Sequence, residues 1–103
     1  MIDMVNIKVA PGKIVKALEW AKKLIAYEKK AGLAEESFIL RRVTGETSAF
    51  SFVGRYASMA DFEERHNKMI ADSGWAEILR EGTESDWRLE RRRNICEVVE
   101  SAS

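Results

Sequence analysis

The sequence predicts an α+β domain: a ferredoxin-like βαββαβ sandwich with a short extra helix before the last strand. Two kinds of segment predict it. Apolar and polar residues alternate in some segments, as in strands, and recur every three or four positions in others, as on one face of a helix. The order of these segments fits four antiparallel strands with both main helices on one face. At 103 residues, we expect a single domain over 1–103.

The first two expected elements are a strand over 2–10 and a helix that follows Pro11. Alternation along the strand places Val5 and Ile7 on the same face. Gly32 is expected to end the helix, because a residue without a Cβ atom readily takes a left-handed cap conformation. The apolar stripe of this helix consists of Ile14, Ala17, Leu18, Ala21, Leu24 and Ile25.

The middle of the chain predicts an antiparallel hairpin over 36–43 and 48–56, because a short polar link joins two apolar segments. Ser58 and Asp61 then resemble a capping box at the start of a second helix. After an interruption at 72–74, a short helix holds Trp75, Ile78 and Leu79, and a loop is expected over 82–86. The last strand is expected after Trp87 and includes Ile95, Cys96, Val98 and Val99.

The hairpin strands carry large apolar side chains on both faces: Phe38 and Leu40 alternate with Ile39 and Val43. Helices on one side of an antiparallel sheet leave its other face open, and such a face is usually polar. We therefore expect a second copy of the chain to cover that face, which makes the protein a homodimer.

Three features follow one another in residues 45–79: a strand with the sequence Phe-Val-Gly-Arg-Tyr, a helix capped by Ser58, and an Asp-x-x-Trp segment beginning at Asp72. With this order, nearly the whole chain resembles the dimeric α/β-barrel superfamily, which includes NIPSNAP-like proteins and antibiotic-biosynthesis-monooxygenase-like domains. The resemblance implies a homodimer whose two sheets face each other, with a pocket between sheet and helices. Members include cofactor-independent oxygenases, haem-degrading enzymes, isomerases and dehydratases, so it implies no single activity.

One subset of that superfamily can be tested by residue. Haem-degrading members carry an asparagine on the first strand and an iron-binding histidine on the helix after the aromatic residue. Here Val5 stands at the strand position, Asn6 is one residue away on the opposite face, and no histidine follows Trp75 up to Leu79. These departures argue against haem degradation.

Composition excludes several other classes of protein. The 17 Lys and Arg residues balance 17 Asp and Glu residues, whereas a nucleic-acid-binding domain usually has a strong basic excess. One Cys and one His cannot make a four-ligand zinc site within one chain. Because the glycines form no phosphate-binding or dinucleotide motif, we expect no cofactor. Without a signal sequence or an apolar stretch of roughly 20 residues, we expect a cytoplasmic protein with no membrane association.

His66 and Glu28 are the candidate catalytic residues, because each lies on the apolar stripe of one main helix. In a ferredoxin-like fold the end of the first helix lies beside the start of the second, so the two side chains are expected to meet. The Glu28 carboxylate would then orient the imidazole and raise the pKa of His66, making it a general base. The alternative is that His66 packs at the edge of the core while Glu28 reaches past the end of its helix.

Trp75, Tyr56 and Arg42 are the expected ligand-binding residues. Trp75 is interpreted as a pocket wall, or as a plug that packs the short helix onto the core. Arg42 lies on the hairpin, where the alternative is an ion pair within the sheet or between subunits.

A basic cluster near the last strand has two interpretations. Guanidinium groups bind carboxylates or phosphates through paired hydrogen bonds, which would make the cluster a recognition site. Charged residues on an edge strand also prevent unwanted strand pairing, and we favour this second interpretation. The cluster consists of Arg88, Arg91, Arg92 and Arg93.

The leading hypothesis is a homodimer that binds a small organic molecule beneath its helices. If it is catalytic, it would carry out cofactor-independent oxygenation or a proton-shuttling isomerisation. The alternative is a non-catalytic binding or stress-associated module whose pocket is filled by side chains. An unfilled cavity beside His66 with several polar groups would favour the first hypothesis.

Overall fold

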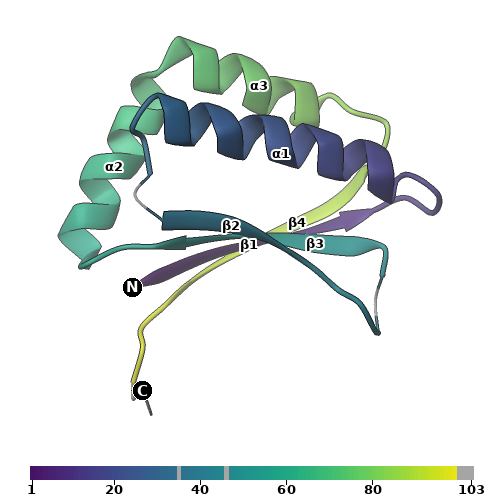
Figure 1. Ribbon diagram of the computed structural model, residues 1–103, viewed down its shortest axis with the longest axis horizontal. Coiled ribbons are helices and arrows are strands. Elements are labelled where there is room, and N and C mark those ends of the chain that lie inside the picture. Colours follow the sequence, from purple (N-terminus) through teal and green to yellow (C-terminus); the bar gives the residue numbers. More distant parts are fainter. Residues whose placement is uncertain (35, 46, 100–103) are drawn as a thin grey trace.

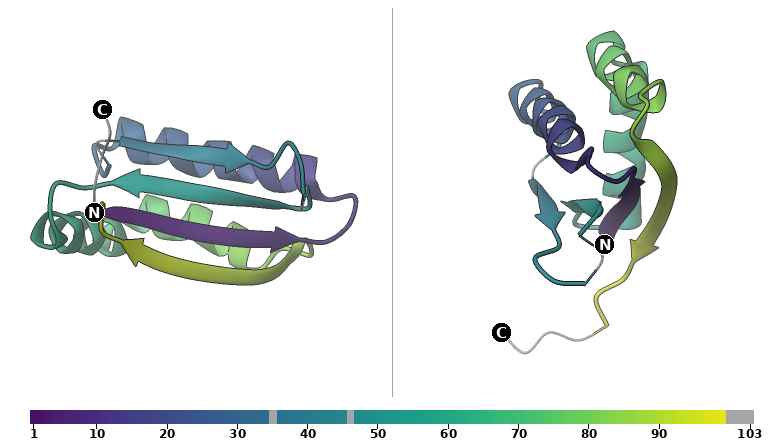
Figure 2. Two further views of the ribbon diagram at one scale, coloured as in Figure 1. Left: turned by 90° about the horizontal axis from the view of Figure 1, so that it is seen from below. Right: turned by 90° about the vertical axis from the view of Figure 1, so that its right-hand side faces the viewer.

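The computed structural model describes residues 1–34, 36–45 and 47–99, which form two layers (Figures 1 and 2). One layer is an antiparallel sheet of β1 (Ile2–Val9), β2 (Glu36–Arg41), β3 (Ala49–Arg55) and β4 (Arg88–Cys96) in the order β2-β3-β1-β4. The other layer consists of α1 (Ile14–Lys30), α2 (Met59–Ala71) and α3 (Ser73–Thr83), all on one side of the sheet. The ferredoxin-like fold with an additional helix before the last strand is confirmed. The sheet of one chain is not a closed barrel.

The helix ends follow the local signals in the sequence. Gly32, just beyond α1, has a φ of 69°, a conformation that glycine adopts without steric cost. The Ser58 hydroxyl accepts a hydrogen bond from the backbone N–H of Asp61 at 3.1 Å. The Asp61 carboxylate accepts one from the backbone N–H of Ala57 at 3.2 Å, so the two side chains satisfy free donors around the start of α2.

α3 is longer than the short helix that the sequence predicts. It continues through Gly82, which is buried against the Trp20 ring, so the expected loop at that residue is wrong. α3 also lies alongside α1 (Figures 1 and 2). β4, the last strand, ends at Cys96. Val98 and Val99, which are expected in this strand from the sequence, lie outside it.

The core lies between α1 and the middle of the sheet. Phe50 and Val9 are fully buried there. The Trp20 ring packs edge-on against Phe52, with the two centroids 5.6 Å apart, and lies 5.3 Å from the ring of Trp87. Because its indole nitrogen also donates a 2.7 Å hydrogen bond to the Ile78 carbonyl oxygen, Trp20 joins α1, the sheet and α3.

The face of the sheet turned away from the helices is partly apolar. The strand register places Met4, Phe38 and Val53 side by side on this face, with Leu40 next to them. Phe38 is 37% exposed and Leu40 is 47% exposed. In the described part of the chain, no helix is both long enough and apolar enough to span a bilayer.

Candidate active-site pocket

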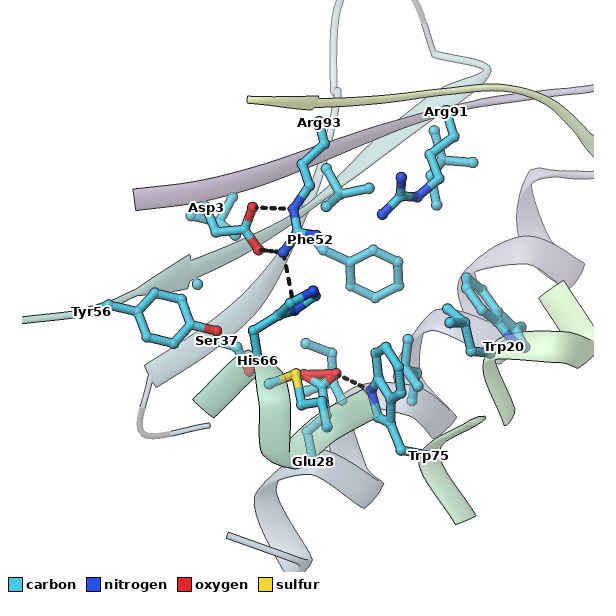
Figure 3. A pocket seen from close by; sticks show the side chains of 18 of the residues that line it. Asp3, Trp20, Glu28, Ser37, Phe52, Tyr56, His66, Trp75, Arg91 and Arg93 are labelled. Carbon is cyan, nitrogen blue, oxygen red and sulfur yellow. Dashed lines mark hydrogen bonds and ion pairs between the residues drawn. The ribbon is translucent and has the colours of Figure 1, made fainter. Parts of the chain in front are cut away.

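A cavity of about 100 Å³ lies between the helical layer and the sheet (Figure 3). Its floor is formed by residues of all four strands, and its walls come from all three helices. Apolar side chains such as Phe52, Leu24 and Met69 make up much of the lining, and polar groups from several elements converge on it. A mostly apolar pocket with a few placed polar groups is typical of small-molecule sites.

Glu28 is the buried carboxylate of this pocket. It is 8% exposed, and its Oε2 accepts a hydrogen bond from the indole Nε1 of Trp75 at 3.1 Å. Burial raises the pKa of Glu28 above its ordinary value of 4.5, and the nearby Asp3 charge acts in the same direction. The hydrogen bond from Trp75 opposes this rise in pKa without cancelling it. The pocket therefore holds a carboxylate with increased proton affinity.

Trp75 is positioned by the junction of α2 and α3. Asp72 caps α3, since its Oδ1 accepts a hydrogen bond from the backbone N–H of Trp75 at 2.9 Å. The hydroxyl of Tyr27 donates to the same Oδ1 at 2.6 Å. Tyr27 and Glu28 are neighbours on α1, so two consecutive residues hold the cap of α3 and the indole that follows it.

His66 belongs to a different group from the one that the sequence predicts. Its Nδ1 lies 3.5 Å from Nη2 of Arg93, and its ring stacks on Phe62 with the centroids 5.3 Å apart. Arg93 in turn donates to both carboxylate oxygens of Asp3, each at 2.9 Å. Figure 3 shows His66 and Glu28 on the same side of the pocket, each hydrogen-bonded elsewhere.

The expected electrostatic role of Glu28 on His66 is therefore corrected. Burial and the positive charge of Arg93 lower the pKa of His66 below its ordinary value of 6.5 instead of raising it. No hydrogen bond joins Glu28 and His66 in the described part of the chain. The lowered pKa favours the neutral imidazole of His66 at neutral pH, and Glu28 is the group with the raised proton affinity.

The three expected ligand-binding residues lie on two sides of the sheet. Trp75 and Tyr56 line the pocket, and burial raises the pKa of the Tyr56 hydroxyl to about 12, so it stays protonated. Arg42 lies on the opposite face, at a separate cavity of about 170 Å³ that Asn6 and Arg92 also line. The sheet thus separates Arg42 from Trp75 and Tyr56.

Several pocket residues are not among the expected ligand-binding residues, although the basic cluster has recognition of an anion as one of its two interpretations. Asp3 and the arginines of β4, Arg91 and Arg93, face the helices. The signal for Asp3 was present, because it has the same parity along the strand as Val5 and Ile7. Among the described residues, no group of three His, Cys, Asp or Glu side chains is arranged to hold a metal ion.

The fold has clear relatives among solved structures. A NIPSNAP domain protein from Burkholderia xenovorans superposes with a TM-score of 0.78 at 11% identity, covering 99% of this chain and 98% of that one. A NIPSNAP family protein of unknown function from Agrobacterium tumefaciens gives 0.74 at 18% identity, covering 92% and 84%. An antibiotic biosynthesis monooxygenase gives 0.70 at 12% identity, covering 97% and 100%. These likenesses establish a shared fold.

The sequence itself identifies the family. No curated protein matches it significantly. The family model described as NIPSNAP matches residues 3–100, which is nearly the whole chain. The protein belongs to the NIPSNAP family.

Proposed function

We propose that this protein binds a small organic molecule in the pocket between its helices and its sheet. The observation that carries the proposal is a buried carboxylate, Glu28, beside an unfilled cavity with mainly apolar walls. The cavity volume is of the same order as that of a cavity that admits a single benzene ring, roughly 150 Å³. The ligand body held inside is therefore about the size of one ring.

The chemistry that this site supports best is proton transfer. A carboxylate whose pKa is raised by burial is a stronger base than an exposed one, and it can later return the proton. Removal of a proton from a carbon acid leaves a carbanion. Its reprotonation at another carbon is an isomerisation, and its oxidation by dioxygen is a cofactor-independent oxygenation. In this proposal Glu28 accepts the proton, and neutral His66, whose Nδ1 accepts from Arg93, can donate a hydrogen bond to the ligand from its Nε2–H.

The alternative is a non-catalytic module whose pocket is filled by side chains. The cavity beside His66, with Asp3, Glu28 and Tyr56 also on its lining, favours a ligand site over that alternative. The monooxygenase among the structural neighbours is consistent with oxygenation, but at 12% identity it supports the fold alone.

The proposal includes a homodimer. Phe38 and Leu40 are exposed on the helix-free face of the sheet, and a second copy packed on that face would remove them from water.

A titration followed by NMR tests ligand binding directly. The protein has three tryptophans, whose indole N–H signals are resolved with ¹⁵N labelling, and the Trp75 signal is identified by its loss in Trp75→Phe. Adding benzamide, a neutral single-ring probe, should shift the Trp75 signal, because this indole lines the cavity. The signal of Trp87, which does not line the cavity, should stay in place. If the Trp75 signal does not move up to the solubility limit of benzamide, the proposal fails.

A further inference from the structure

Arginine side chains of β4 line the sheet side of the pocket. Arg88, Arg91 and Arg93 all contribute to its lining, and Figure 3 shows the guanidinium of Arg91 pointing from β4 into the pocket. Arg92, between the last two, lies on the other face at the second cavity. The two interpretations of this basic cluster thus apply to different residues: Arg92 faces away from the helices, and Arg91 faces the candidate ligand site.

Arg91 differs from Arg88 and Arg93 in having no hydrogen-bond or ion-pair partner among the described residues. Arg93 is paired with Asp3, and Arg88 donates a 3.2 Å hydrogen bond to the hydroxyl of Thr83. In the ranges 1–34, 36–45 and 47–99, Arg91 makes no hydrogen bond or ion pair. Burial and the charges of Arg93 and Arg88 lower its pKa, so Arg91 lies where a further positive charge is unfavourable. An anion bound there would relieve that repulsion.

The charges of the pocket lining leave room for one negative charge. Three guanidinium groups, those of Arg88, Arg91 and Arg93, face two carboxylates, those of Asp3 and Glu28. When both carboxylates are ionised, three minus two leaves one uncompensated positive charge. His66 and Tyr56 are neutral at pH 7 and do not change this balance.

The position of Arg91 also separates an anionic group from the buried base. Arg91 comes from the sheet, which forms the floor of the cavity, and Glu28 comes from the helical layer, so they lie on opposite sides of the cavity. An anion bound to Arg91 is therefore held away from the Glu28 carboxylate. The apolar side chains that also line the cavity, among them Phe52 and Leu24, suit an uncharged ligand body.

We propose that the ligand of this pocket is a small organic monocarboxylate, whose carboxylate binds Arg91 and whose body of about one ring occupies the cavity next to Glu28. This inference rests on the proposed ligand site and names its substrate class. A guanidinium group suits a carboxylate because its planar N–H groups donate two parallel hydrogen bonds to the two oxygens.

Three probes of equal size and shape test the charge of the ligand. Benzoate, benzamide and benzamidine share one planar ring and differ in carrying a negative, zero or positive charge at pH 7. In the Trp75 indole titration at low salt, benzoate should bind about tenfold more tightly than benzamide, and benzamidine should bind most weakly. Raising the salt concentration should reduce the advantage of benzoate, because screening weakens the attraction.

A pair of variants assigns the effect to one residue. Arg91→Gln should remove the roughly tenfold preference for benzoate while leaving the affinity for benzamide within about twofold of wild type. Arg92→Gln is the matched control: it removes the same charge from the adjacent residue of β4, on the face away from the pocket, and should leave the preference intact.

The outcomes separate this inference from the proposed function. If all three probes bind with similar affinity, or if Arg91→Gln keeps the preference for benzoate, the pocket binds ligands but the carboxylate assignment is wrong. If none of the probes shifts the Trp75 signal, both the ligand site and its assignment are overturned.

Discussion

The indole of Trp75 donates a hydrogen bond to the carboxylate of Glu28, across 47 positions of the sequence. The residue before Glu28, Tyr27, binds the Asp72 carboxylate that caps the helix carrying Trp75. α1 and α3 are therefore joined at the pocket by two consecutive side chains. The position of the buried carboxylate depends on α3, the helix that the sequence suggested was only a short insertion.

The stability of Glu28→Gln relative to that of the wild type should increase as the pH rises. The pKa of Glu28 is higher in the folded chain than its ordinary value of 4.5, so the folded state binds more protons than the unfolded state between these two values. Wild-type stability is therefore lost as the pH rises through that window, and glutamine removes the loss while still accepting the Trp75 hydrogen bond. Urea unfolding of both proteins at a series of pH values measures the difference, which should grow from below pH 4.5 upward. A difference that stays constant with pH would contradict the raised pKa.

Tyr27→Phe should raise the pKa of Asp72 towards its ordinary value of 3.8. The Tyr27 hydroxyl is the main cause of the lowered pKa of this carboxyl, and the cap to Trp75 is the second. Carboxyl ¹³C NMR follows the titration. The carboxyl of Asp86, whose pKa is lowered by Lys16, serves as an internal reference that should not change. The Trp75 indole signal should also shift, because its helix cap loses one partner.

The single histidine of the sequence gives a direct readout of the Arg93–Asp3 pair. Arg93 lowers the pKa of His66 and Asp3 raises it. Arg93→Gln should therefore move the pKa of His66 upward, and Asp3→Asn should move it downward. Both shifts are measured from the imidazole signals in an NMR titration, and shifts of the same sign in the two variants would rule out this arrangement of charges.

Gly82→Ala should destabilise the protein by about 1–3 kcal/mol, the usual cost of overpacking. A Cβ atom at this position would lie 2.3 Å from Cζ2 of Trp20, and the ring has no room to move because it packs against Phe52 and Trp87. Alanine is otherwise the better helix former, so any loss reflects this contact. Unfolding experiments in a Trp20→Leu background provide the control: there the same substitution should cost nothing or stabilise.

The order of elements could be predicted from the sequence because each carries a local signal: alternation, a helical stripe, or a cap such as Ser58 with Asp61. The hydrogen-bond partner of Glu28 could not be predicted. The expected pairing with His66 assumed that the second main helix lies beside the first, whereas α3 lies alongside α1 and supplies Trp75. Which helix takes that place depends on packing between distant segments, such as Gly82 against Trp20, and periodicity within one segment carries no information about it.

The arginines show the same limit. Four of them lie within six residues, a cluster that by itself indicates one charged edge. The register with β1 places Arg91 and Arg93 on the pocket side and Arg92 on the other face. The shift in that register next to Val9 brings Arg88 to the pocket side as well. Alternation along the last strand would have assigned Arg91 and Arg93 to one face, but not Arg88.

The homodimer gives the last prediction, because one chain leaves an apolar strip of sheet in water. Phe38 and Leu40 lie next to each other on the helix-free face, beside Met4 and Val53. A stable interface buries roughly 800 Å² on each partner, and a charge placed inside it without a partner would strongly oppose assembly. Sedimentation equilibrium should therefore give twice the 11.7 kDa chain mass for the wild type and the chain mass for Leu40→Glu. Val15→Glu, at a position on α1 that is 63% exposed, adds the same charge on the helical side and should remain dimeric. A wild type that sediments at 11.7 kDa at high concentration, while keeping a folded spectrum, would mean that this face is stable in water and that no second copy covers it.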